Sequence, residues 1–95
     1  MKRVKTFESF LNEGNTGNEL AAKFTQETGI STWDSVKLPS ESGKWLVVAI
    51  WAPKDRGGKN PGLEIELTKG SSRMHFQVMD DDGKLTSKGE GLKKV

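Results

Sequence analysis

Hydrophobic positions follow a helical period near the N-terminus and a strand period over most of the remaining chain. Within residues 1–13, Phe7, Phe10 and Leu11 recur at i, i+3 and i+4, which predicts a short amphipathic helix with one apolar face. Such a short helix is marginal on its own in water, because nucleating the first turn is unfavourable. Its apolar face therefore needs a partner surface, either on its own domain or on another protein.

Residues 14–18 are polar and glycine-bearing, and this composition predicts a flexible linker. The segment 19–95 is predicted to be one domain that opens with a second helix. Thr16 and Glu19 have the spacing of a capping box at the start of this helix. Gly29 is the expected left-handed residue at its end.

The rest of the chain carries strand signals separated by turn residues. The segment 44–52 is apolar on both sides, which indicates a central strand, and the tail from residue 88 is predicted to be loosely ordered. Hairpin-linked strands after a helix favour an α+β fold, with the N-terminal helix or helices packed on a small antiparallel β-sheet of about four strands. The strand segments are 33–38, 44–52, 63–68, 73–79 and, more briefly, 84–87.

The amino-acid composition limits which functional sites the chain can form. The chain has 95 residues, and 33% of them are hydrophobic. The chain has no cysteine, which excludes disulfides and thiolate sites, and its single histidine cannot build a multi-histidine metal site. We therefore predict no metal, no cofactor and no catalytic residue. The net charge of +2 does not indicate nucleic-acid binding. Residues 45–52 form the longest strongly apolar run, which is too short to span a bilayer. The first residues lack the apolar stretch of a secretory signal, so we expect a protein that acts inside a cell or a particle.

Two features are candidate partner-binding sites. Trp45 and Trp51 lie six residues apart on one predicted strand, hence on one face, where they form either a shallow aromatic platform or part of the core. The loop 53–62 either approaches a phosphate or an acidic partner, or is an ordinary solvated hairpin loop. Its basic side chains are Lys54, Arg56 and Lys59.

Two further features carry no predicted chemistry. The run 80–83 superficially resembles a calcium loop, but Gly91 stands where the bidentate glutamate is needed, so a tight turn is expected. His75 alternates with Met74 and Phe76 and is expected to point away from the core. No serine lies in a nucleophile-elbow context, and we predict that the protein is not an enzyme.

The N-terminal helix carries a more specific pattern, Lys5-Thr6-Phe7-Glu8-Ser9-Phe10-Leu11-Asn12-Glu13 followed by Gly14. It resembles the capsid-targeting peptide of internal head proteins of large tailed phages, which has the form Lys-Thr-aromatic-x-x-Phe-aliphatic-x-Glu. The resemblance implies docking to a prohead scaffold through Phe7 and Phe10. It also implies cleavage by a prohead protease after Glu13, in the triplet that begins at Leu11. The match is limited to residues 1–14, and three additional residues near the start depart from the pattern.

The leading hypothesis is an internal virion protein that is packaged through residues 1–13, cut after Glu13, and delivered from the virion interior into the host cytoplasm to bind or inhibit a host factor. The alternative is a non-virion module whose first helix is part of the fold and whose Trp45/Trp51 face or basic loop binds a protein or a nucleic acid. A third hypothesis, a small hydrolase-like enzyme, requires a pocket that converges on His75 or on clustered carboxylates.

Overall fold

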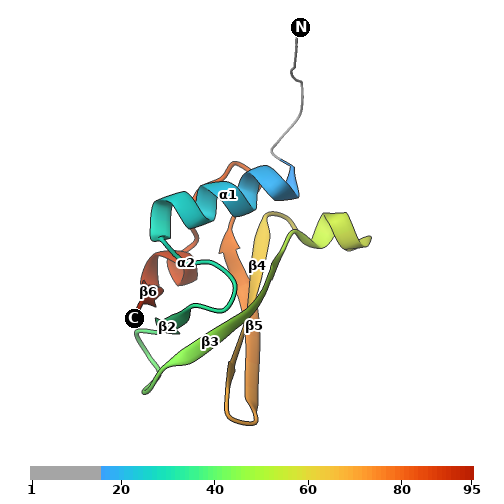
Figure 1. Cartoon of the computed structure of the whole chain (residues 1–95). Coiled ribbons are helices and arrows are strands. Elements are labelled where there is room, and N and C mark those ends of the chain that lie inside the picture. Colours follow the sequence, from blue (N-terminus) through green and yellow to red (C-terminus); the bar gives the residue numbers. More distant parts are fainter. Residues whose placement is uncertain (1–15) are drawn as a thin grey trace, which may run out of the picture.

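The computed structural model describes residues 16–95, so the candidate targeting and cleavage residues Phe7, Phe10, Leu11, Glu13 and Gly14 lie outside the described part. An antiparallel sheet in the order β5-β4-β3-β2-β6 carries the helix α1 across one end (Figure 1). The predicted α+β class is confirmed, with five strands instead of about four. In chain order the elements are α1 (Gly17–Thr28), β2 (Ser35–Lys37), β3 (Trp45–Trp51), the 3₁₀ helix η1 (Pro53–Arg56), β4 (Leu63–Lys69), β5 (Ser72–Met79), α2 (Ser87–Gly91) and β6 (Lys93–Lys94).

Both ends of α1 are fixed by the residues that the sequence indicates. The Thr16 hydroxyl accepts from the Glu19 N–H at 3.1 Å, and the Thr16 N–H donates to the Glu19 carboxylate at 2.9 Å. Gly29 ends the helix at φ 75°, and its N–H donates to the Thr25 carbonyl. The capping box and the left-handed end are therefore confirmed. Residues 16–18, assigned to a linker from composition, are the cap and the first two residues of α1.

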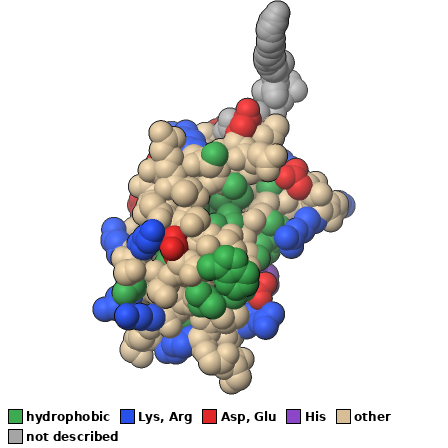
Figure 2. All heavy atoms as spheres, in the orientation of Figure 1, with side chains coloured by type: hydrophobic (Ala, Val, Ile, Leu, Met, Phe, Trp, Pro, Cys, Tyr) green, Lys and Arg blue, Asp and Glu red, His purple; other side chains and the backbone are tan. Residues whose placement is uncertain are grey.

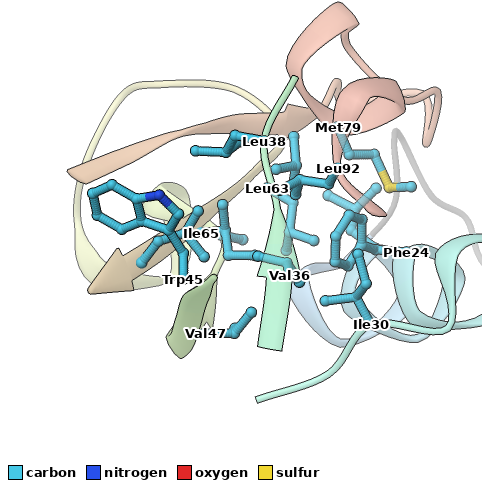
Figure 3. Packing of buried hydrophobic residues seen from close by; sticks show 14 residues of the cluster. Phe24, Ile30, Val36, Leu38, Trp45, Val47, Leu63, Ile65, Met79 and Leu92 are labelled. Atoms are coloured by element: carbon cyan, nitrogen blue, oxygen red, sulfur yellow. The ribbon is translucent and has the colours of Figure 1, made fainter. Parts of the chain in front are cut away.

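The core forms between α1 and one face of the sheet. Leu20 and Phe24 are the buried residues of α1, and Ile30 folds back under the helix end with no exposed surface. Figure 3 shows Phe24 and Ile30 facing side chains from the sheet. Fully burying a side chain of this kind stabilises the fold by about 1.5–3 kcal/mol. The other buried members are Val36, Leu38, Trp45, Val47, Ala52, Leu63, Ile65, Leu67, Val78, Met79 and Leu92.

The hairpin β4–β5 extends from the core as its sequence predicts. Ile65 pairs with Phe76 and Leu67 with Met74, so apolar side chains of both strands share the core face. A short turn through Gly70, which has φ 61°, connects the two strands.

A β-bulge between Val47 and Ala49 determines which face of the sheet each β3 side chain occupies. Before the bulge, Val47 pairs with the buried Leu67. After it, Ile50 pairs with the buried Ile65, whereas regular alternation would place Ala49 on that face. One extra residue in β3 therefore reverses the alternation of every residue that follows.

The bulge separates the two tryptophans of β3. Trp45 is 3% exposed and belongs to the core, whereas Trp51 pairs with Glu64 on the opposite face. The prediction that Trp45 and Trp51 share one face is wrong, because the spacing of six residues includes the extra residue of the bulge.

The end of the chain is ordered, in contrast to the loose tail predicted from residue 88. Thr86 caps α2 by accepting from the Gly89 N–H, and its own hydroxyl donates to the Gln77 carbonyl of β5 at 2.7 Å. A Cβ at Gly89 would collide with the Val78 carbonyl, so α2 approaches β5 through a glycine. β6 then pairs with β2. The short strand predicted at 84–87 is reduced to one bridge, between Leu85 and Met79.

Candidate functional site

The sheet face opposite the core is the strongest candidate for a binding surface. We call it the open face and define it by nine residues of β3, β4 and β5 that lie in three cross-strand rows. Directly opposed residues of antiparallel strands project to the same side, so each row is continuous across the three strands. Trp51, Glu64 and Gln77 form the first row, Ala49, Glu66 and His75 the second, and Leu46, Thr68 and Arg73 the third.

An aromatic and basic cluster occupies one end of the open face. The rings of Trp51 and His75 have centroids 6.0 Å apart at an angle of 58°. The guanidinium of Arg56, which belongs to η1, lies 5.0 Å from the centroid of the Trp51 ring, within cation–π range. Since η1 begins just after β3 ends, the loop returns Arg56 to the strand that carries Trp51. The structure thus brings two of the predicted binding residues, Trp51 and Arg56, together.

Hydrogen bonds and an ion pair connect the charged residues of the open face. Glu66 accepts from Arg73 at 2.9 Å, and Glu64 accepts from the Asn60 side-chain amide at 3.3 Å. The Gln77 side-chain amide donates to the Pro61 carbonyl at 2.9 Å. The nine residues of the open face include two glutamates and one arginine, so the net charge of this surface is small. Such a surface suits a protein partner better than the polyanionic backbone of a nucleic acid.

Lys54 and Lys59 do not join this cluster. The Lys54 ammonium lies 2.9 Å from an Asp81 oxygen, so it ties η1 to the turn after β5. The other Asp81 oxygen accepts from the Gly62 N–H at 2.7 Å. Gly62 has φ 77°, and a Cβ there would collide with the Met79 carbonyl, so this crossing of the two loops requires glycine. Lys59 is exposed in the loop beyond η1.

The hydrogen bond from Lys54, followed by the one from Gly62, holds the pKa of the Asp81 carboxyl below its ordinary value. The neighbouring Asp80 accepts from the N–H groups of Asp82 and Lys84 at 2.9 Å, and Gly83 has φ 82°. The expected tight turn at 80–83 is confirmed, and the carboxylates of Asp80 and Asp81 accept hydrogen bonds there.

The structure places the remaining predicted residues as follows. Trp45 lies in the core, so the platform alternative for it is excluded, and the Lys69 ammonium stands 5.3 Å from its ring centroid. His75 is exposed beside Trp51 and lies directly across the strands β4 and β5 from Glu66. The prediction that His75 points away from the core is therefore confirmed. Among residues 16–95, no group of three or more His, Asp or Glu side chains is placed to hold a metal ion. No helix in the same range is long and apolar enough to cross a membrane.

One residue with the geometry of a binding anchor was missed by sequence reasoning. Trp33 is 69% exposed, and it is the one residue other than glycine with positive φ, at 78°, within residues 16–95. A bulky side chain in this conformation costs about 1–3 kcal/mol. The segment that contains Trp33 was interpreted as the start of a strand, although Ser31 and Asp34 around it are turn-forming residues that argue for a bend.

The ion pair of Asp81 predicts a pH-dependent stability. Because its folded-state pKa is lowered, the ionised carboxylate stabilises the fold above the ordinary value of 3.8, and this contribution is lost as the pH falls through the folded-state value. Asp81→Asn retains an acceptor for Gly62 but removes the charge that faces Lys54. We expect its thermal midpoint at pH 7 to lie a few degrees at most below that of the unsubstituted protein, and this difference to shrink as the pH is lowered towards 2.

Asp82→Asn is the matched control, because Asp82 is the adjacent carboxylate of the same turn and forms no ion pair with another described residue. Its midpoint is expected to follow that of the unsubstituted protein at every pH. A constant difference between Asp81→Asn and the unsubstituted protein from pH 7 to pH 2 would contradict the assignment.

Comparison of the chain with protein-family models, with curated proteins and with solved structures returns no match.

Proposed function

We propose that the chain is an internal virion protein of a tailed phage. Residues 1–13 dock it to the prohead scaffold, and the prohead protease cuts after Glu13. The domain that remains passes from the virion interior into the host cytoplasm, where it binds and inhibits a host protein. It acts as a binding module and not as an enzyme.

The observation that carries this proposal is the position of the start of α1 relative to the proposed cleavage site. Thr16 caps α1 through its own side chain and that of Glu19, only three residues after Glu13. The described core runs from Leu20 to Leu92. A product that begins at Gly14 therefore retains every residue of this core and both members of the capping box.

The open face supports the binding part of the proposal. Trp51 and Arg56 are of the residue types most enriched among interface hot spots, and they are already in contact here. The cleaved product has 12 basic and 11 acidic residues, which gives it almost no electrostatic attraction to nucleic acid. A protein is thus the favoured partner, and a nucleic acid remains the alternative.

Mass spectrometry of mature particles tests packaging and processing. We expect a species that starts at Gly14 and no species that retains residues 1–13. Glu13→Gln removes the charge at the cleavage position and is expected to leave the packaged protein uncut. Glu8→Gln, a glutamate of the same peptide outside the Leu11–Glu13 triplet, is the control and should be cut normally. Absence of the protein from mature particles would overturn the packaging proposal.

We compare the thermal midpoint of the full chain with that of a fragment starting at Gly14. The comparison tests whether residues 1–13 are a targeting peptide that can be removed without loss of stability. We expect the two midpoints to agree closely. If Phe7, Phe10 and Leu11 packed on the domain, each would contribute about 1.5–3 kcal/mol. Each kcal/mol corresponds to roughly 4–8 °C in a domain of this size. A large drop in the fragment would favour the non-virion module, whose first helix belongs to the fold.

Substitutions on the open face test the site of host-factor binding. Once a host protein is captured by the cleaved domain, Trp51→Ala is expected to weaken its binding by at least about tenfold, the loss typical of a hot-spot side chain. Gln26→Ala, on an exposed position of α1, should bind as the unsubstituted domain does. Equal affinities for all three proteins, with folding verified by circular dichroism, would exclude the open face as the binding site.

A further inference from the structure

Trp33 projects from a turn that fixes the backbone on both sides of it. The Asp34 N–H donates to the Ser31 carbonyl at 3.1 Å, which places Trp33 third in a four-residue turn. With φ at 78°, it occupies the position at which a type II turn favours glycine. The Trp33 N–H also donates to the Val47 carbonyl at 2.7 Å, and the Val47 N–H donates to the Asp34 carbonyl at 2.9 Å. The turn is thereby anchored to the central strand β3.

The Asp34 side chain strengthens this anchorage. Its Oδ2 accepts from the Ser31 N–H at 2.8 Å and from the Ser31 hydroxyl at 3.2 Å. The Lys94 ammonium of β6 lies 3.4 Å from the same oxygen. The Ser31 N–H is the main reason that the pKa of Asp34 lies below its ordinary value. The backbone around Trp33 is therefore fixed by hydrogen bonds, which lowers the conformational entropy that this segment loses on binding a partner.

Most of the Trp33 side chain contributes nothing to the core. Its exposed fraction of 69% is the largest among the large hydrophobic residues of the described part, ahead of Val95 and Leu46. A buried aromatic ring would compensate for its unfavourable backbone conformation through packing, but this one does not. Figure 2, in the orientation of Figure 1, shows hydrophobic side chains reaching the surface below α1, with basic side chains along both margins.

The strands next to Trp33 carry positive charge. Lys37 of β2 and Lys93 of β6 are direct cross-strand partners, and both are exposed. Like charges in this relation repel each other. Neither forms an ion pair with another residue of the range 16–95. Lys37 follows Trp33 by four residues, so at most about 14 Å of chain separates them. An anionic ligand at this pair would relieve the repulsion.

We propose that Trp33, Lys37 and Lys93 form a docking surface for an acidic peptide segment of a partner protein. An aliphatic or proline side chain of that segment lies on the Trp33 indole, and its carboxylates pair with the two lysines. A protein ligand is favoured over nucleic acid because the site has one exposed aromatic instead of a series. This surface is distinct from the open-face cluster at Trp51, and it does not depend on packaging into a virion.

NMR titration of the full chain tests the surface. The probe is a synthetic six-residue peptide with four acidic residues around a central Leu-Pro pair, and its counterpart carries lysine at the four acidic positions. We expect saturable shifts of the Trp33 indole N–H and of the β2 and β6 amides with the acidic peptide alone. The indole N–H groups of Trp45 and Trp51 serve as internal controls in the same spectrum and should not shift.

Variants separate binding from folding. Trp33→Gly suits the turn, so its thermal midpoint should equal or exceed that of the unsubstituted protein while affinity for the acidic peptide falls at least tenfold. The double variant Lys37→Glu, Lys93→Glu leaves Trp33 in place and should show a similar loss of affinity. Trp51→Ala should bind the peptide normally, which distinguishes this surface from the open face.

Four outcomes would overturn the proposal. The first two are the absence of saturation at millimolar acidic peptide and equal binding of the lysine counterpart. The third is tighter binding of a single-stranded DNA oligonucleotide at Trp33. The fourth is a shift of the Trp33 indole signal on dilution without peptide, which would identify a second copy of the chain as the occupant. A fall in the midpoint of Trp33→Gly would likewise show that the indole serves the fold.

Discussion

The bulge in β3 is the constraint on which the arrangement of both faces depends. β3 is the middle strand of the sheet. Side chains before the bulge, up to Val47, and after it, from Ile50 onward, have to contribute to the same core. Strict alternation from Val47 would direct Ala49 and Trp51 into that core and Ile50 away from it. The extra residue reverses this order, so Ile50 faces the buried Ile65 and the indole of Trp51 is released to the opposite side. One inserted residue thus places Trp45 in the core and Trp51 on the opposite face of the same strand.

The parts of this fold that the sequence predicts are those whose information is local. The capping box of Thr16 and Glu19, the glycine at the end of α1 and the alternation of β4 each lie within a few residues, and each was identified correctly. The bulge was not predictable, because a strand that is apolar on both sides looks the same in either register. β6 was missed for a related reason. Two lysines carry no strand pattern, and their pairing with β2 depends on α2 turning the chain back.

The candidate site likewise has a part that the local sequence predicts and a part that depends on tertiary contacts. The basic loop was recognised from composition, but tertiary contacts decide what each cation does: Arg56 reaches Trp51, while Lys54 is held by Asp81. Trp33 was missed because its residue type suits a strand and its conformation does not. A positive φ at a bulky residue is fixed only by the surrounding hydrogen bonds, here those that Trp33 donates to Val47 and that Asp34 donates to Ser31. Strain of this kind is visible in a structure and not in a sequence.

Trp33 and the capping box of α1 differ in what they contribute to the stability of this small domain. Residues 16–95 supply both caps of α1 and the buried core of the described domain. The two aromatic groups that project from it, at Trp33 and at Trp51, leave the sheet in different ways, one through a strained turn and the other through a bulge. Both are deviations from regular strand geometry. In a sheet this short, such deviations are the means by which large side chains reach solvent while the core face remains apolar.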